Sequence, residues 1–370
     1  MKIAFRDLSL DSSELKERYF SAINKLYEHG QFILGPEVKS LEDKLAESAG
    51  RKHCIAVSSG TFALYAVLFY LKNKFPKRTQ VILPSISWIA TAQAILAAGL
   101  EPYFVDTDED FFINTKAFEK AITAKTLAVI SVDFTGVVGS TYSNLISICS
   151  KKRIYLIQDS AQAYGSYYKE ADVLYRACGV GFASCLSINS MKLLASHGEG
   201  GAIFTDNSNL EKHLRLFRSQ GCQKRDPKIF GLNGRMETLQ AAIALVSMQE
   251  VDKLIEARQK IAAFYIKSLI DISEIKLPFL DTNKRHTFYT FQIRVRNRDE
   301  LFNYLMSNNI ECQKQYSYLL SDTPHLSIYP SSNMEISRRI VNTALCLPCH
   351  EKLKKKDINY ITQKIKTFYS

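Results

Sequence analysis

An aspartate and a lysine near the middle of the chain each follow a short apolar run. Residues 154–157 begin after three basic residues and predict a buried parallel strand that ends close to Asp159. Lys192 follows a second predicted strand at residues 183–188. Ligands of open α/β sheets bind at the carboxyl ends of the strands, so we expect this carboxylate and this amine to face one pocket.

This pair of groups is the pair that pyridoxal phosphate requires. The cofactor needs a lysine amine to hold its aldehyde carbon, and an anion beside its pyridine nitrogen so that the ring can accept electrons. Asp159 would stabilise the charged ring nitrogen by ion pairing, and Lys192 would hold the aldehyde and carry protons. Taken singly, the two residues have a plainer interpretation as a strand-end aspartate and a surface lysine, because both types are usually exposed.

The segments around the two residues decide between these interpretations. The sequence is Gln-Asp-Ser-Ala-Gln-Ala at residues 158–163, Ser-Ile-Asn-Ser-Met-Lys at residues 187–192 and Gly-Glu-Gly-Gly at residues 198–201. These segments resemble, in type and order, those of the DegT/DnrJ/StrS-type sugar aminotransferases, a branch of the fold-type I pyridoxal-phosphate enzymes. The resemblance covers nearly the whole chain and implies that Lys192 and Asp159 are catalytic.

The resemblance also implies an α/β fold with a mainly parallel central sheet flanked by helices, followed by a smaller α+β domain. We place the large cofactor-binding domain, with an N-terminal helical segment, at residues 1–245 and the small domain at residues 246–370. Predicted strands and helices alternate from residue 54 to about residue 220, an order that implies right-handed crossovers. A dinucleotide-binding Rossmann fold is the alternative, but residues 178–183 lack the third glycine of its motif and come late.

A segment of small residues connects the first predicted strand to the helix that follows it. Residues 58–61 are Ser-Ser-Gly-Thr, and the free N–H groups at the positive end of a helix suit a phosphate. On its own the segment is more typical of an ordinary helix cap. The resemblance implies that Ser59, Gly60 and Thr61 bind the cofactor phosphate and that Ser187 contacts it too.

Two further side chains are assigned to the cofactor ring by the resemblance. Trp88, the only tryptophan, would stack on the ring, although an aromatic of this kind could equally belong to the core. Gln162 would approach the ring hydroxyl. Asp133 and Thr135 stand where the family usually has His-x-Tyr-Gly, and we expect this departure to alter substrate contacts.

The segment Gly-Leu-Asn-Gly-Arg at residues 231–235 predicts how two copies of the chain assemble. It resembles a family element in which the asparagine reaches across a dimer to the partner's cofactor phosphate. The resemblance therefore implies a homodimer with shared active sites and a phosphate contact from Asn233, while the plainer interpretation of Asn233 is a helix N-cap. A single long helix is predicted to follow and to run towards Ile270, linking the two domains.

Composition and charge exclude several other classes of protein. The 370 residues carry 48 Lys+Arg against 37 Asp+Glu, a formal charge of +11 that could suit nucleic acid or an anionic substrate. No nucleic-acid module is evident, and no apolar run is long enough for a membrane span. The eight cysteines include one CxxC pair, Cys346 and Cys349, without the histidines or second pair of a zinc site. We expect a cytosolic protein with no metal, nucleic acid or membrane partner.

The function implied by the resemblance is transfer of an amino group from an amino acid, commonly glutamate, to a keto-sugar that is most often nucleotide-linked. Such reactions supply amino sugars for surface polysaccharides or antibiotics. One alternative is a sugar dehydratase of the same family, but those enzymes carry histidine where Lys192 stands. The other is a regulatory protein that keeps the fold and binds the cofactor without turnover, which we expect to lack the lysine or to carry an added domain.

Overall fold

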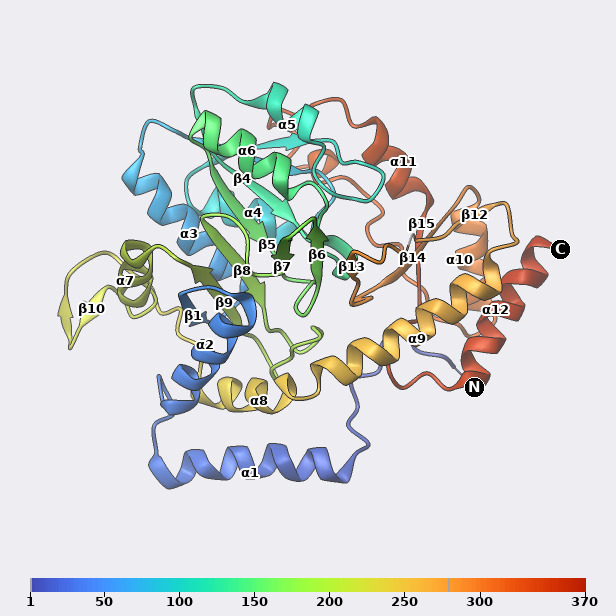
Figure 1. Ribbon diagram of the computed structural model, residues 1–370, viewed down its shortest axis with the longest axis horizontal. Coiled ribbons are helices and arrows are strands. Elements are labelled where there is room, and N and C mark those ends of the chain that lie inside the picture. The colour runs from blue at the N-terminus through green and yellow to red at the C-terminus, as the bar shows by residue number, and fades with distance from the viewer. Residues whose placement is uncertain (1, 279) are drawn as a thin grey trace.

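The computed structural model describes residues 2–278 and 280–370, and a seven-stranded sheet forms the centre of its larger part (Figure 1). In spatial order the strands are β1 (His53–Val57), β9 (Gly201–Thr205), β8 (Ala183–Ser187), β5 (Tyr155–Asp159), β4 (Thr126–Val132), β2 (Gln80–Pro84) and β3 (Glu101–Val105). β9 runs antiparallel to both of its neighbours, and every other adjacent pair is parallel. The predicted fold class, α/β with a mainly parallel sheet, is confirmed.

Successive residues of the central strands point to opposite faces of the sheet, and each face is covered by helices. In β4, Ala128 and Ile130 belong to one core cluster and Val129 belongs to the other, as the two-residue period of a strand requires. One cluster packs against α3 (Gly60–Lys74), α4 (Ile89–Ala97) and α7 (Ser208–Phe217). The other packs against α2 (Pro36–Ala49), α5 (Thr115–Ala121), α6 (Tyr142–Lys152) and α8 (Thr238–Met248).

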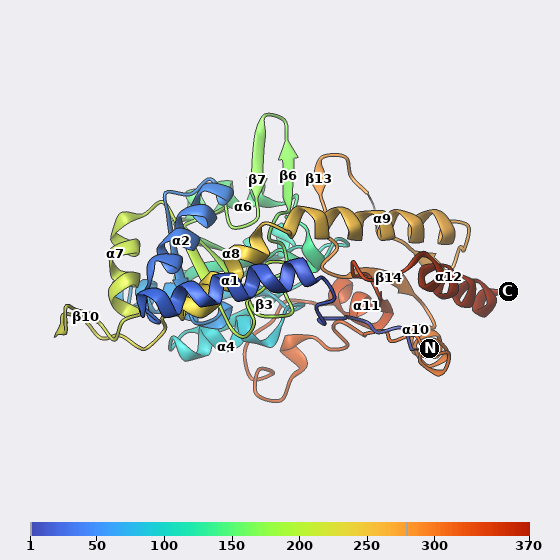
Figure 2. The same cartoon turned by 90° about the horizontal axis from the view of Figure 1, so that it is seen from below.

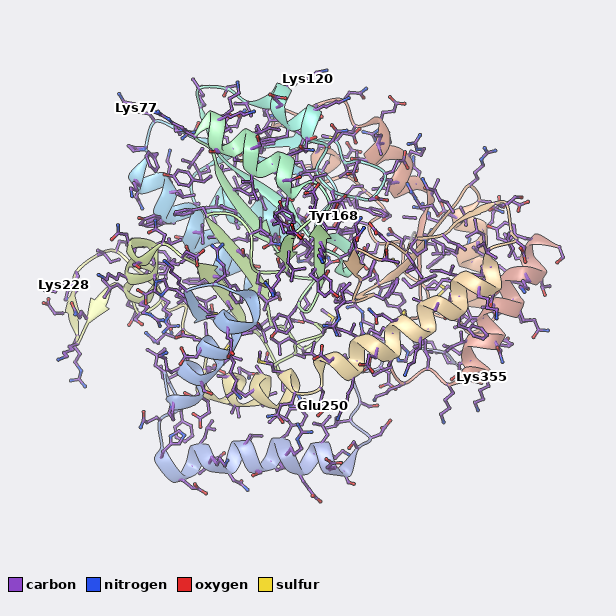
Figure 3. All side chains as sticks on the ribbon, viewed as in Figure 1. Lys77, Lys120, Tyr168, Lys228, Glu250 and Lys355 are labelled. Carbon is purple, nitrogen blue, oxygen red and sulfur yellow. The ribbon has the colours of Figure 1, made fainter. Side chains whose placement is uncertain are left out.

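The single long helix predicted after residue 238 is wrong, because the chain forms two helices there. α8 ends at Met248 and α9 (Val251–Leu269) begins three residues later, with a turn at Gln249 and Glu250. Arg18, in α1 (Ser13–His29), donates hydrogen bonds to the side chains of both turn residues at 2.6 Å. Figure 3 marks Glu250 at this junction. A side chain from a helix far away in the sequence thus stabilises the break between α8 and α9. The local sequence around residue 249 does not indicate this break.

The smaller part of the molecule is α+β, as predicted. It contains the sheet of β12 (Ile275–Lys276), β14 (Phe291–Val295) and β15 (Ala344–Leu347), and the helices α10 (Arg298–Ser307), α11 (Glu335–Thr343) and α12 (Lys355–Tyr369). Ile3 joins its core and bridges to Ile310, so the N-terminus packs with C-terminal residues. Leu320 and Leu326 pack instead into the core of the large sheet. A domain boundary at residue 245 stays a prediction.

Two hairpins project from the body (Figure 2). One pairs β6 (Tyr167–Glu170) with β7 (Val173–Arg176), and β13 (Lys284–Arg285) adds to its edge. The other pairs β10 (Cys222–Gln223) with β11 (Asp226–Pro227). Two short 3₁₀ turns, η1 (Phe134–Gly136) and η2 (Leu320–Asp322), complete the described elements.

The distribution of lysines and the character of the helices concern two partners considered from the sequence, nucleic acid and a membrane. Four of the lysines, Lys77, Lys120, Lys228 and Lys355, lie at separate edges of the molecule rather than in one patch (Figure 3). Within the described residues, no helix combines the length and the apolar character needed to cross a bilayer. The cytosolic location stays a prediction.

Candidate active site

A cavity of about 790 Å³ opens at the carboxyl ends of the central strands, between the large sheet and the C-terminal part. Eight of the nine site residues predicted from the sequence line it: Ser59, Gly60, Thr61, Trp88, Asp159, Gln162, Ser187 and Lys192. The ninth, Asn233, does not. Side chains that are far apart in the sequence therefore meet in one cavity, as the strand-end argument predicted.

Asp159 is the last residue of β5 and is buried against the floor of the cavity. Its carboxylate accepts hydrogen bonds from the Thr91 hydroxyl at 3.0 Å and from the Ala161 N–H at 3.2 Å. Burial raises the pKa of the carboxyl group, although these two donors and the charge of Lys192 act against the rise. A cation placed beside this carboxylate would offset its desolvation, and a protonated pyridine nitrogen is such a cation.

Lys192 lies on the connection between β8 and β9 and contacts an aromatic residue that the sequence did not indicate. Its Nζ lies 3.4 Å from the hydroxyl oxygen of Tyr289 and 4.8 Å from the centroid of that ring. The guanidinium carbon of Arg6 lies 4.5 Å from the same centroid. Burial acts to raise the pKa of Tyr289, but the charges of Lys192 and Arg6 outweigh it, so the pKa is lowered overall.

The turn before α3 forms a cradle in which only main chain fits. Ser59 caps the helix by accepting the Phe62 N–H at 3.1 Å, so the ordinary-cap interpretation holds together with the site interpretation. A Cβ at Gly60 would lie 2.9 Å from the Cβ of Ser187, and a Cβ at Gly201 would overlap the carbonyl group of Ser59. Residues 59–61 line the cavity beside Ser187, so the start of the helix, where N–H groups lack partners within the helix, lies at the cavity wall.

Trp88 and Gln162 lie on the walls of the cavity. The indole of Trp88 is 55% exposed, which excludes a place in the core and leaves a flat apolar face for a ligand ring. Gln162 is buried, and its Oε1 accepts the Thr135 N–H at 3.1 Å. The Tyr316 ring lies 5.8 Å from the Trp88 ring and its hydroxyl lies 3.5 Å from Gln162 Nε2. Tyr316 belongs to the C-terminal part of the chain and reaches this cavity only because the two parts of the molecule pack together.

Asp133 and Thr135, which were expected to alter substrate contacts, both make hydrogen bonds within the protein. The Asp133 carboxylate lies outside the cavity lining and accepts hydrogen bonds at 2.8 Å from three buried groups: the hydroxyls of Tyr142 and Ser160 and the amide of Gln158. Burial raises the pKa of Asp133 to about 7, although these hydrogen bonds oppose the shift. Thr135 acts through its N–H, which orients Gln162.

Asn233 lies on the surface, outside the cavity of its own chain. The next residue holds the segment against the sheet, since the Gly234 carbonyl oxygen accepts the Ser58 N–H at 2.8 Å. The N-cap of α8 is Glu237, four residues later, so Asn233 does not cap that helix. The helix-cap interpretation is therefore wrong, and the exposed amide of Asn233 is available to another chain.

The geometry of the cavity agrees with comparisons to known proteins. The profile of the DegT/DnrJ/EryC1/StrS aminotransferase family matches residues 13–366. The chain belongs to this family. It is therefore a pyridoxal-phosphate-dependent sugar aminotransferase by family, and the fold type expected from the sequence is confirmed.

Individual relatives share the whole length of the chain. UDP-2-acetamido-2-deoxy-3-oxo-D-glucuronate aminotransferase of Pseudomonas aeruginosa is 32% identical over 361 residues, which cover 97% of this chain and 98% of that protein. A solved DegT DnrJ EryC1 StrS aminotransferase from Brucella abortus is 30% identical, with a TM-score of 0.91 and full coverage of both chains. A pleiotropic regulatory protein of Geobacillus stearothermophilus is 30% identical over 375 residues, covering 100% of this chain and 99% of that one.

The residues of the cavity fit the family's cofactor. A buried carboxylate, a lysine amine, a main-chain cradle at the start of a 15-residue helix and an exposed indole surround one space. Each of these features has a counterpart in the cofactor: the ring nitrogen, the aldehyde, the phosphate and the ring face. Of the site residues, Arg6, Thr91, Tyr289 and Tyr316 were not predicted: Thr91 follows Trp88 closely, but Arg6, Tyr289 and Tyr316 come from segments without a recognisable motif.

Proposed function

We propose that this aminotransferase moves an amino group from an amino acid, glutamate in the first instance, to the keto group of a nucleotide-linked sugar. The observation that carries the proposal is the placement of Asp159 and Lys192 in one cavity with the start of α3. The cavity volume of about 790 Å³ suits a ligand larger than an amino acid alone. The Pseudomonas aeruginosa relative, which acts on a UDP-linked keto-sugar, supports the choice of substrate.

Each cavity residue has a role in this proposal. Bound pyridoxal phosphate supplies an electron sink and carries the amino group between the two substrates. Asp159 keeps the proton on the ring nitrogen, since its buried carboxylate is stabilised by a neighbouring positive charge. The Lys192 amine would hold the aldehyde carbon of the cofactor, and once free it would serve as the base that moves a proton at the reacting carbon of the donor.

The remaining predicted residues hold the cofactor in place. Ser59, Gly60 and Thr61 offer the phosphate the N–H groups and hydroxyls at the start of α3, and Ser187 adds a hydroxyl from β8. The exposed Trp88 indole would cover one face of the ring. The Gln162 amide, oriented by the Thr135 N–H, approaches the ring hydroxyl. None of these proposed roles uses a metal ion.

We also propose that the active unit is a homodimer with two shared sites. Asn233 is exposed and lies outside its own cavity, so its amide can reach a partner's phosphate. Exposed apolar side chains lie in the same segment and in the segment paired with it: Phe32, Ile33, Leu34, Phe230 and Leu232 are between 38% and 62% exposed. A backbone bridge between Ile33 and Glu237 brings residues 32–34 close to the segment that contains Asn233. Exposed apolar side chains gathered in this way are typical of protein interfaces.

The direct test of the reaction uses the purified protein loaded with pyridoxal phosphate. On mixing with L-glutamate, we expect the absorbance of the lysine-bound cofactor to convert to that of the pyridoxamine form, and a keto-sugar nucleotide to restore it. Borohydride reduction and peptide mapping should place the cofactor on Lys192, and Lys192→Ala is the control that cannot form the link. A label on another lysine would refute the assignment.

The second candidate function is regulatory binding without turnover, and the Geobacillus stearothermophilus relative gives a reason to keep it. The presence of Lys192 favours catalysis. The same glutamate experiment separates the two functions. A regulatory protein would bind the cofactor and show no conversion with any of a panel of amino donors.

The shared-site dimer is tested by complementation of two inactive variants. Lys192→Ala lacks the amine, and Asn233→Asp places a negative charge where the partner's phosphate binds. After mixing and reassociation, one of the two sites in a mixed dimer carries both changes and the other carries neither. We therefore expect up to half of the wild-type activity per mixed dimer. An active monomer in solution, or a reassociated mixture with no activity, would contradict the shared site.

A further inference from the structure

The N-terminal segment brings an arginine into the active-site cavity. Ile3 donates its N–H to the Asn309 carbonyl oxygen at 2.8 Å, and the Ile3 carbonyl oxygen accepts the Glu311 N–H at 3.0 Å. The Phe5 N–H then donates to the Glu311 carboxylate at 3.0 Å, and the Phe5 side chain is buried. The backbone beside Arg6 is thus held by the smaller part of the molecule, and the Arg6 side chain lines the cavity.

The guanidinium of Arg6 rests on aromatic rings close to the reacting end of the cavity. Its central carbon lies 4.5 Å from the centroid of the Tyr289 ring and 5.5 Å from that of Phe5. The Lys192 Nζ lies 4.8 Å from the same Tyr289 centroid. Stacking on aromatic faces limits the rotamers of the arginine, and a guanidinium has five N–H donors, more than the hydroxyl of Tyr289 can accept.

Two other charged side chains of the cavity have partners within the protein. Glu199 accepts a hydrogen bond from Asn189 at 2.6 Å, and Lys314 pairs with Asp299 at 2.7 Å. Arg6 is half-buried, and within residues 2–278 and 280–370 no carboxylate lies within 4.0 Å of it. A partly desolvated guanidinium without an anion favours a ligand that brings one.

We propose that Arg6 binds a carboxylate of the amino-acid donor. The inference rests on the proposed aminotransferase function, in which the donor amine replaces the Lys192 amine on the cofactor. Every amino-acid donor carries a carboxylate on the reacting carbon, so that group must come close to Lys192, where Arg6 lies. The planar guanidinium matches a carboxylate with two parallel hydrogen bonds.

The first measurement is binding of glutarate, a dicarboxylate without an amine, to the pyridoxal-phosphate holoenzyme by calorimetry. We expect Arg6→Met to weaken binding by about 10- to 100-fold, the effect of losing charge-assisted hydrogen bonds. Arg6→Lys keeps the charge without the planar fork and should lose part of that affinity. Arg338→Met is the matched control, because this exposed arginine pairs with Asp322 outside the cavity lining. Retention of the lysine-bound cofactor absorbance shows that each variant is folded.

The second measurement separates the sources of the carboxylate. The half-reaction is followed with L-glutamate, with L-alanine and, from the pyridoxamine form, with a keto-sugar nucleotide. Weaker saturation of Arg6→Met by both amino acids supports the proposal and identifies the α-carboxylate, and weaker saturation by glutamate alone supports it and identifies the side-chain carboxylate. A loss confined to the keto-sugar step, or unchanged glutarate binding and donor saturation, overturns it. If the wild type does not react with any donor, the proposed function fails, whereas the glutarate result still tests Arg6.

Discussion

Asp159 and Asp133 lie side by side at the ends of adjacent strands but have opposite surroundings. The Asp133 N–H donates to the Asp159 carbonyl oxygen at 2.9 Å, and both carboxylates are buried. Asp133 accepts from three side chains and stands apart from the cavity, whereas Asp159 accepts from one side chain and one N–H and lines the cavity. Burial alone therefore does not mark a catalytic carboxylate.

The two residues differ in whether donors of the protein itself satisfy the hydrogen-bonding capacity of the carboxylate. The donors around Asp133 fill its lone pairs, so the group serves the structure by tying β5 residues and α6 to the end of β4. The donors around Asp159 orient it and leave room for a ligand cation. A buried carboxylate with an incomplete set of donors beside a cavity is the one that we propose to bind a ligand.

The largest effect that we predict is loss of turnover in Asp159→Asn. The change is nearly isosteric, so the fold and the melting temperature should persist. An amide cannot stabilise the charged ring nitrogen, and we expect turnover to fall by about two orders of magnitude or more. Steady-state kinetics of the purified holoenzyme checks this, with thermal unfolding as the control. A variant that transaminates at nearly the wild-type rate would show that Asp159 is not the partner of the ring.

Asp133→Asn should give the reverse pattern, a loss of stability with a smaller loss of activity. Its amide nitrogen would face donors such as the Ser160 hydroxyl and the Gln158 amide, leaving buried groups without acceptors. We expect a decrease of about 1–3 kcal/mol in the free energy of unfolding. Urea unfolding of the apo-protein measures it. Full stability together with lost turnover would place Asp133 in the chemistry and remove the contrast with Asp159.

The pH dependence of stability sharpens the same contrast. The pKa of Asp133 is raised from 3.8 to about 7 in the folded protein, so between these values the folded state binds the proton that the unfolded state has lost. The Asp133 contribution is therefore fully present below about pH 4 and is lost as the pH rises through 7, by at most about 1.4 kcal/mol per pH unit. Urea unfolding at pH 5, 6 and 7 should show this slope in the wild type, and Asp133→Asn should lack it. Equal slopes in the two proteins would contradict the raised pKa.

The smallest effect should come from Thr91→Val, which removes the one side-chain donor of Asp159 and keeps the shape of the residue. Loss of a hydrogen bond that favours the charged carboxylate costs about 1 kcal/mol, so we expect turnover to fall about fivefold. Thr91→Ser keeps the hydroxyl and serves as the matched control. If both variants have equal turnover, the Thr91 hydroxyl does not support Asp159.

The sequence by itself determined those parts of the site that lie within single segments. Asp159, Lys192 and the Ser59–Thr61 turn were predicted because an apolar run followed by polar or small residues marks the end of a strand. The parallel order of the strands then brings those ends to one edge of the sheet. The fold class and the family followed from the same local motifs, and both are confirmed.

The tertiary structure decided which other side chains complete the cavity. Arg6 comes from the N-terminal segment and Tyr289 from the loop just before β14, and they meet Lys192 only after the two parts of the molecule pack together. The break after α8 likewise depends on Arg18 from α1. Hydrophobic patterns determine elements and the faces they bury, but contacts between polar side chains distant in sequence depend on packing, and local patterns carry no record of it.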